Sequence, residues 1–146
     1  MILQILMAGL GTAGFALIFH MRKRFLPVVA VGGMLVWGVY LLMVLAYPGK
    51  VFLPSLIAGG AGALYAEMLA RVCKAPSTPF FQTSVIALIP GRALYKAVNA
   101  VVKGEFADAG SYGTDAFACA LGIALGMGIA WTICDLSRKV RKTTNR

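Results

Sequence analysis

Cationic and amide side chains recur at helical spacing in one short segment of an otherwise apolar chain. Their positions follow i, i+4, i+7 and i+11, which places all four on one face of a helix. Pro90 and Gly91 interrupt the apolar run directly before them. A helix that restarts after such a break exposes its first N–H groups and the positive end of its dipole, and both favour anions. The segment therefore predicts a binding site for a small anionic or zwitterionic solute. The four side chains are Arg92, Lys96, Asn99 and Lys103, and Tyr95 flanks their first turn.

Pro90 is the residue expected to break this helix. Because proline has no backbone N–H, the carbonyl of Ile86 loses its helical partner, and the proline ring crowds the same turn. Gly91 makes the break easier to open. Two half-helices are predicted, over residues 80–89 and 92–102. The alternative is a kinked helix whose cations only reach toward the membrane surface. Three polar side chains upstream are expected to complete the pocket, namely Gln82, Thr83 and Ser84.

The elements that position this segment are expected to be membrane-spanning helices. Hydrophobic residues make up 60% of the 146 residues and charged residues 13%, and the mean hydropathy is +0.82, a balance typical of integral membrane proteins. A crossing helix needs about 20 apolar residues, and several runs reach that length. We expect an all-α, single-domain, multi-pass protein of five spans, with the fourth span broken. The predicted spans are residues 2–21, 25–47, 51–70, 80–102 and 116–133, followed by a basic tail over 137–146.

Basic residues predict the orientation of these spans, because Lys and Arg are enriched in cytoplasmic connections. One set of alternate connections collects almost all of them, whereas the other holds only Lys50 and Lys103. We therefore expect an N-terminus outside and a C-terminus in the cytoplasm. A fourth segment that turned back within the membrane would place the basic tail outside, so the count favours a full crossing. The cytoplasmic set comprises Arg22, Lys23, Arg24, Arg71, Lys74 and the tail.

Two carboxylates lie in or beside the predicted spans. Glu67 precedes Arg71 by one helical turn, so an ion pair at the interface and a proton-coupling role are both open. Asp115 opens the predicted fifth span, where we expect it to cap the helix. Gating or proton coupling is the alternative role for Asp115.

Small residues at four-residue spacing predict close helix packing in lipid. One stripe lies in the third span and the other in the fifth. Such stripes join helices within one chain or between subunits, and both arrangements are open here. The residues are Gly59 and Ala63 in the first stripe, and Ala118, Gly122, Gly126 and Ala130 in the second.

Several function classes lack their sequence machinery in this chain. No nucleophile–base constellation or phosphate-binding glycine loop is present, so we expect no enzyme. Three cysteines without a CxxC pattern and a single histidine predict neither a metal site nor a cofactor. The net charge of +9 is gathered at the ends of apolar runs without a groove-binding motif, so we expect no nucleic acid partner.

A longer pattern surrounds the break, and in it the chain resembles the threonine/serine exporter (ThrE) family. The likeness is closer to short subunits that correspond to the C-terminal half of full-length exporters. Where the family often shows Ile-Pro-Leu-Val-Pro-Gly, this chain has Ile86-Ala87-Leu88-Ile89-Pro90-Gly91. Ala87 replaces the first proline, while Pro90 keeps the second. The remaining matching segments are Ala75-Pro76-Ser77, Ala93-Leu94-Tyr95 and Lys103-Gly104-Glu105-Phe106.

The resemblance implies export of threonine, serine or a related small carboxylate such as succinate, driven by the proton gradient across the bacterial inner membrane. It further implies a larger membrane subunit as partner. An odd number of spans that starts outside suits such a partner, because the two halves then form inverted repeats. Two alternatives remain open. One is a structural subunit that scaffolds a partner through the glycine stripe, and the other is a small homo-oligomeric, anion-selective channel.

Overall fold

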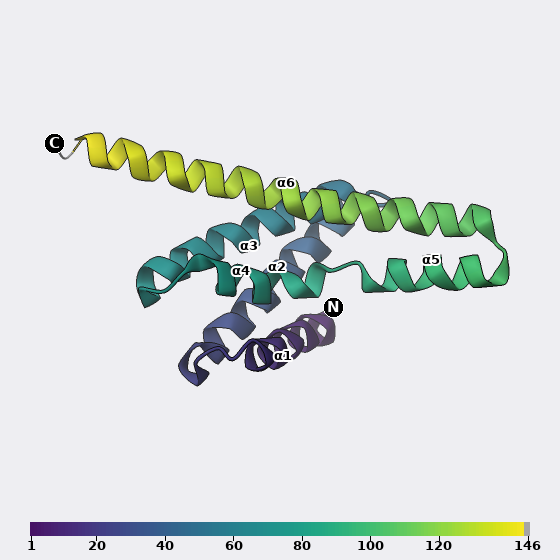
Figure 1. Cartoon of the computed structure of the whole chain (residues 1–146), viewed down its shortest axis with the longest axis horizontal. Coiled ribbons are helices and arrows are strands. Elements are labelled where there is room, and N and C mark those ends of the chain that lie inside the picture. The colour runs from purple at the N-terminus through teal and green to yellow at the C-terminus, as the bar shows by residue number, and fades with distance from the viewer. Residues whose placement is uncertain (145–146) are drawn as a thin grey trace.

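The regular structure of the described chain is entirely helical. The computed structural model describes the backbone of residues 1–144 and the side-chain exposure of residues 1–137. Figure 1 shows the helices as an elongated bundle in which neighbours in sequence run back and forth. The elements are α1 (Ile2–Ile18), η1 (Lys23–Phe25), α2 (Leu26–Ala46), α3 (Phe52–Cys73), α4 (Ser77–Val85), η2 (Ile86–Leu88), α5 (Gly91–Lys103) and α6 (Phe106–Thr144).

Three helical segments are long and apolar enough to cross a membrane by themselves. The first is η1 continued by α2, the second is α3, and the third is the Phe106–Ser137 part of α6. The pair formed by Ser77–Leu88 and Gly91–Lys103 would make a fourth span if its two members cross together. With 17 residues, α1 is shorter than the length of about 20 residues that a full crossing needs. Five crossings and their orientation therefore stay predictions.

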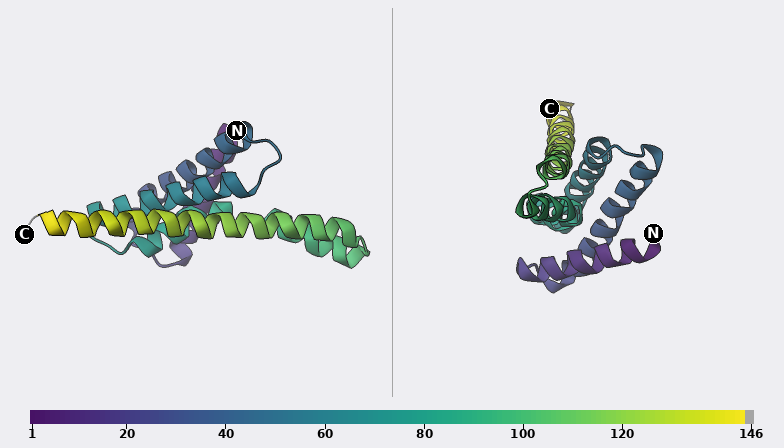
Figure 2. Two further views of the ribbon diagram at one scale, coloured as in Figure 1. Left: turned by 90° about the horizontal axis from the view of Figure 1, so that it is seen from above. Right: turned by 90° about the vertical axis from the view of Figure 1, so that its right-hand side faces the viewer.

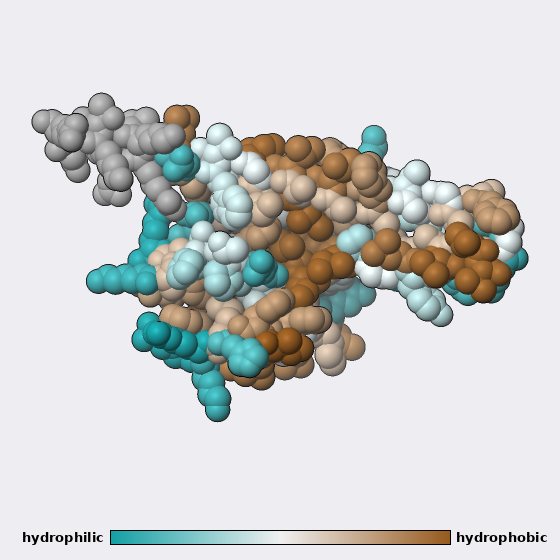
Figure 3. Space-filling view, viewed as in Figure 1, coloured by the Kyte–Doolittle hydropathy of each residue, from teal (hydrophilic) through white to brown (hydrophobic). Residues whose placement is uncertain are grey.

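Large apolar side chains cover much of the outer surface. Ile2 on α1 is 78% exposed and Val102 on α5 is 80% exposed. In the space-filling view, hydrophobic residues dominate the middle of the visible face, and hydrophilic ones gather at its left end (Figure 3). An apolar surface of this extent is unfavourable in water but suits contact with lipid. The surface agrees with a multi-pass membrane protein.

The tightest packing joins α3 to α6 through the predicted glycine stripes. A Cβ atom added at Gly122 would lie 2.6 Å from the carbonyl oxygen of Phe52, and one at Gly59 would lie 3.0 Å from the Cα of Ile123. A Cβ at Gly126 would collide with the carbonyl oxygen of Leu56. The stripes therefore pack helices within this chain. Ala63 and Ala130 are buried in the same part of the core, and Ala118 is half-buried.

A second part of the core lies where α2, α3 and α4 meet. Phe80 is almost fully buried, and its ring meets that of Phe25 edge to face with centroids 5.4 Å apart. The hydroxyl of Tyr65 on α3 donates a hydrogen bond of 2.7 Å to the carbonyl of Val28 on α2. The ring contact holds the short helix α4 against the start of α2, and the hydrogen bond joins α3 to α2 beside it.

Helix α6 begins earlier than the sequence pattern predicted. Its first residue is Phe106, ten residues before the apolar run at 116, so Asp115 lies inside the helix and the prediction that it caps the helix is wrong. The physical reason is the turn before α6. Gly104 ends α5 with a φ of 79°, a left-handed conformation that glycine adopts readily, and Asp108 then occupies the first turn of α6.

The same turn folds α5 back along the first half of α6. This pair extends well past the ends of the other helices (Figures 1 and 2). The basic turns between α1 and α2 and between α3 and α4 lie at the opposite end of the molecule, together with the C-terminal end of α6 (Figure 1). The chain thus separates a basic end from the end that carries the α5–α6 pair.

Candidate functional site

The helix break is a short stretch of altered backbone, in which α4 passes into the 3₁₀ turn η2 and α5 starts after Pro90. The two sides of the break are bent by 50°. The carbonyl of Ile86, which Pro90 leaves without its helical donor, accepts a hydrogen bond of 3.3 Å from the N–H of Ile89. The N–H of Gly91 donates to the Ile89 carbonyl at 2.7 Å. The predicted break at Pro90-Gly91 is therefore present, and its freed carbonyl has a local partner.

The first half-helix differs from the prediction in its bounds. It runs from Ser77 to Val85 and does not continue to residue 89. Residues 86–88 tighten into the 3₁₀ turn, and Ile89 is extended with a ψ of 126°. The residue before a proline is disfavoured in the helical region, which explains why the helix ends ahead of Ile89. The second half-helix matches closely, because α5 spans Gly91–Lys103.

A pocket of about 390 Å³ lies beside this break, and we call it the break pocket. It is formed where η2 and the start of α5 approach α2 and α6. Arg92 and Lys96 contribute two cations to it, and Asp115 on α6 contributes a carboxylate. Opposite charges from two helices thus line one hollow. The aromatic residues of its lining are Trp37, Tyr40 and Tyr112.

Aromatic rings contribute to two sides of the break pocket. The Nζ atom of Lys96 lies 5.0 Å from the ring centroid of Tyr112, within the range of a cation–π interaction. On the α2 side, Trp37 and Tyr40 stack with their centroids 5.3 Å apart. Lys96 is half-buried whereas Arg92 is exposed. The ammonium group is therefore anchored, and the guanidinium keeps more freedom to meet a solute.

One wall of the break pocket is tied to the bundle by weak hydrogen bonds through a thiol. The hydroxyl of Ser55 on α3 donates to the Sγ of Cys119 at 3.2 Å, and the Cys119 thiol donates to the Leu88 carbonyl at 3.5 Å. Cys119 is buried and lines the pocket. This chain of contacts connects α3, α6 and η2, so the backbone at the break is fixed relative to the α3–α6 core.

The three polar residues predicted upstream of the break do not line the break pocket. Gln82 is exposed, while Thr83 donates its hydroxyl hydrogen bond to the Pro79 carbonyl at 2.8 Å. Ser84 is fully buried, and a Cβ atom added at Gly32 would lie 2.5 Å from its hydroxyl oxygen. These side chains lie on α4, whose buried face packs on α2 and α3. The bend at η2 then turns the following residues toward α6.

Two predicted residues of α5 also lie outside the lining of the break pocket. Asn99 is exposed one turn beyond Lys96, and Tyr95 is 72% exposed. Tyr95 shares a side of the helix with Val98 and Val102, because these positions recur at three- to four-residue spacing. The pocket therefore takes only the first turn and a half of the predicted stripe.

Glu67 is buried, at 7% exposure, but at a different place in the bundle. The break pocket reaches Val51 at the start of α3, and Glu67 stands sixteen residues later, about 24 Å along the axis at 1.5 Å per residue. Of the two carboxylates predicted for proton coupling, only Asp115 belongs to the break pocket.

Sequence reasoning missed the aromatic members of the pocket. Tyr112 precedes Asp115 by three residues, which is one helical turn, so both face the same way in α6. That spacing would have been informative had the polar stretch 106–115 been recognised as helical. Trp37 and Tyr40 lie inside an apolar run, where no local signal distinguishes them from core residues.

No group of three or more potential metal ligands occurs in the described part of the chain. The three cysteines are free thiols, with Cys73 at the end of α3 and the other two on α6.

A bundle of apolar helices, with one helix broken beside a pocket that holds charged side chains, is the architecture of a multi-pass membrane protein in which irregular backbone borders a cavity. The family model for the threonine/serine exporter, ThrE, matches residues 4–133. The chain therefore belongs to the threonine/serine exporter family, as its resemblance predicted. Members of this family are transporters and not enzymes. No curated protein and no solved structure gives a significant match to the chain.

Proposed function

We propose that this chain is a membrane subunit of a proton-driven exporter of small carboxylate solutes in the bacterial inner membrane, and that the break pocket binds the solute. Threonine and serine are the first candidates, and a dicarboxylate such as succinate is the second. The observation that carries the proposal is the meeting of Arg92, Lys96 and Asp115 in one pocket at the broken helix.

Arg92 and Lys96 bind the carboxylate in this proposal. A guanidinium group binds a carboxylate through two parallel hydrogen bonds, and a lysine adds a point charge. Helix α5 begins at Gly91, so its first N–H groups and the positive end of its dipole lie at the same end of the pocket. Arg92, Lys96 and the N-terminal end of α5 together favour binding of one anionic group in the pocket.

Asp115 binds the ammonium group of an amino acid. It is the one acidic residue among the lining residues of the break pocket in the described part of the chain. Cations on α5 and a carboxylate on α6 suit a zwitterion, whose ammonium and carboxylate groups are both attached to the same carbon atom. A dicarboxylate would meet repulsion from ionised Asp115, so the pocket favours threonine or serine over succinate.

Asp115 is also the better placed of the two candidate proton carriers. A carboxylate that pairs with the solute's ammonium group would release it on protonation, and this exchange couples proton movement to solute movement. Glu67 is buried far from the break pocket, so it would have to act through a separate proton path. We therefore assign proton coupling to Asp115 and leave Glu67 as the second candidate.

The proposed larger subunit covers the outer side of the break. An apolar groove of about 660 Å³ runs there between α5 and α6. Its wall on α6 combines small residues at helical spacing, which favour close approach of another helix in lipid, with the larger side chains of Phe117, Ile123 and Met127. A helix of the larger subunit in this groove would close the break pocket from outside. The small residues are Gly113, Ala116, Ala120 and Ala124.

Export by cells that express the chain with its partner subunit tests the proposal. Arg92→Gln is expected to reduce the efficiency of labelled threonine and serine export by about 10- to 100-fold, since a hydrogen bond to a charged group contributes about 1.5–3 kcal/mol. Lys23→Gln removes one positive charge outside the break pocket and serves as the control. Normal export by Arg92→Gln at normal protein levels would show that the break pocket does not bind the solute.

A further inference from the structure

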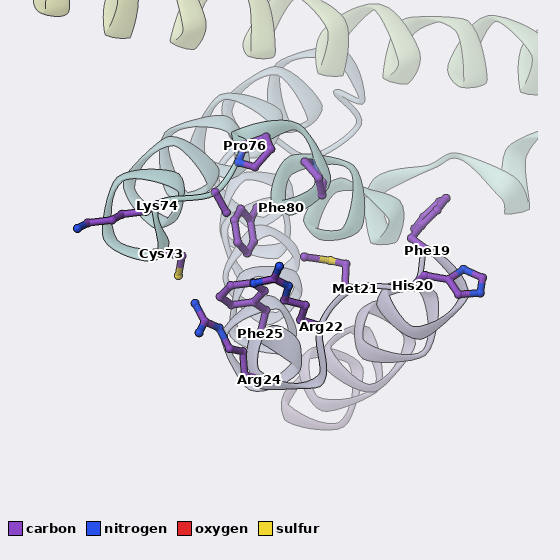
Figure 4. Close-up of a pocket in the computed structure, with 12 residues that line it drawn as sticks. Phe19, His20, Met21, Arg22, Arg24, Phe25, Cys73, Lys74, Pro76 and Phe80 are labelled. Carbon is purple, nitrogen blue, oxygen red and sulfur yellow. The ribbon is translucent and has the colours of Figure 1, made fainter.

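A second pocket, of about 360 Å³, lies at the basic end of the bundle, and we call it the basic pocket. The turn between α1 and α2 forms one wall and the turn between α3 and α4 forms the other (Figure 4). Arg22 and Arg24 come from the first turn, and Lys74 comes from the second. None of its lining residues belongs to the break pocket.

The basic pocket combines cations with an apolar floor. Phe25 and Phe80 form that floor, and the guanidinium carbon of Arg24 lies 4.6 Å from the ring centroid of Phe25. Stacking engages the face of a guanidinium group, so its in-plane N–H groups can still donate to an oxyanion. Figure 4 shows the Arg22 and Arg24 side chains beside the ring of Phe25, whereas the Lys74 side chain points away from this floor. No acidic residue is among the lining residues that the structure describes.

Both turns that form the basic pocket adopt an uncommon backbone conformation. His20 and Lys74 have positive φ angles of 54° and 50°, and they are the non-glycine residues of the described chain that do so. Each of them lines the basic pocket. Each of these residues follows the end of a helix, where a left-handed residue is common. The N–H of Met21 donates to the Ala16 carbonyl at 3.0 Å after α1, and the N–H of Ala75 donates to the Ala70 carbonyl at 3.1 Å after α3. The two turns that border the basic pocket are therefore held by helix-ending hydrogen bonds.

We propose that the basic pocket binds the phosphate of an anionic phospholipid. Lipid is favoured over free phosphate because Phe19 lines the pocket and is 52% exposed, and Ile18, the residue before it in the chain, is 66% exposed. These side chains offer an apolar surface to an acyl chain, which a free phosphate ion does not need. Basic pockets between helices at the cytoplasmic side of a membrane bind anionic headgroups by the same chemistry. The bound lipid fixes the two turns to each other.

The test compares two double variants that each remove two positive charges from the same end of the molecule. Arg22→Gln with Arg24→Gln alters the basic pocket, whereas Lys23→Gln with Arg71→Gln alters exposed cations outside its lining. Each protein is placed in nanodiscs of phosphatidylcholine alone or with phosphatidylglycerol. The readouts are the melting temperature and the lipid that remains bound in native mass spectrometry.

For the unaltered chain we expect phosphatidylglycerol to raise the melting temperature by about 3 °C or more. The pocket variant is expected to lose this rise and to retain about tenfold less phosphatidylglycerol, while the control variant keeps both. Arg22→Gln alone preserves the contact of Arg24 with Phe25, so it separates lost binding from lost folding and is expected to show a partial loss.

Two results would overturn the proposal. Equal losses in the pocket and control variants would mean that general surface charge, and not the basic pocket, attracts the lipid. An equal stabilisation by inorganic phosphate in detergent would mean that the site takes the free ion. The readouts need no transport, so the outcome is independent of whether the break pocket binds an exported solute.

Discussion

Replacement of Asp115 by asparagine distinguishes an amino acid pocket from a dicarboxylate pocket. Asp115→Asn keeps the size of the side chain but removes the negative charge from a pocket that Arg92 and Lys96 also line. If Asp115 binds the solute's ammonium group, threonine loses a charge-assisted hydrogen bond. Succinate instead loses a repulsive neighbour. Threonine binding should therefore weaken, whereas succinate binding should not.

The magnitude follows from the position of Asp115 in the pocket. Two unit charges 4 Å apart interact by about 4 kcal/mol at an effective dielectric constant of 20. Because Asp115 is exposed in the structure, solvent screening reduces this value, and we take the lower end of a charged hydrogen bond, about 1.5 kcal/mol. Threonine affinity is then expected to fall by about tenfold, and succinate affinity to stay equal or rise.

Equilibrium binding to the purified chain with the proposed partner subunit is the suitable assay, because it needs no proton gradient. Binding of labelled threonine and succinate to the unaltered protein and to Asp115→Asn gives the ratio of affinities directly. Transport by the same preparation then reports the separate role in proton coupling. Equal weakening of both solutes, or unchanged threonine binding by folded Asp115→Asn, would refute the assignment of Asp115 to the ammonium group.

Two further predictions concern helix packing and the cationic wall. Gly126→Leu should lower the melting temperature by several degrees, because the new side chain would collide with the Leu56 carbonyl and overpacking costs about 1–3 kcal/mol. Gly128→Leu is the control, since nothing lies within 4 Å of its Cβ position. The control should melt as the unaltered protein does in the same fluorescence-detected assay. Tyr112→Leu should weaken threonine binding by about two- to fivefold through loss of the cation–π contact with Lys96, whereas Tyr112→Phe keeps the ring and should bind as the unaltered protein does. Equal melting of the two glycine variants, or equal binding by the two tyrosine variants, would contradict the respective contact.

The helices and the break could be predicted because their signals are local. A proline removes one donor at a known position, so the interruption at Pro90 follows from the sequence alone. The glycine stripe of Gly122 and Gly126 likewise predicted close packing, although only the structure identifies α3 as its partner. The start of α6 was mispredicted because hydropathy marks where apolar residues begin. A helix can extend past that point when its neighbour, here α5, packs alongside.

The composition of the break pocket depends on contacts between distant parts of the sequence. Arg92 and Lys96 were predicted from their spacing on one helix, but Tyr40 and Asp115 join them only through the fold. Thr83 and Ser84 were assigned to the pocket because they precede the break. The two half-helices are bent by 50°, so residues of the first half-helix do not share the face of the second. No sequence pattern gives the direction of such a bend.

The surface of α5 gives a further argument that this chain works with a second layer of helices. Helix α5 packs mainly on α6, where Ala100 is buried. Its cations lie beside that contact, and Val98 and Val102, both largely exposed, lie on the face that points away from Ala100. If Ser77–Leu88 and Gly91–Lys103 cross together as one span, lipid would suit the valines but not Arg92, which would then lie near the middle of that span. A helix from another subunit would cover the apolar side and shelter the cationic side, so the contact that completes the fold would also close the break pocket.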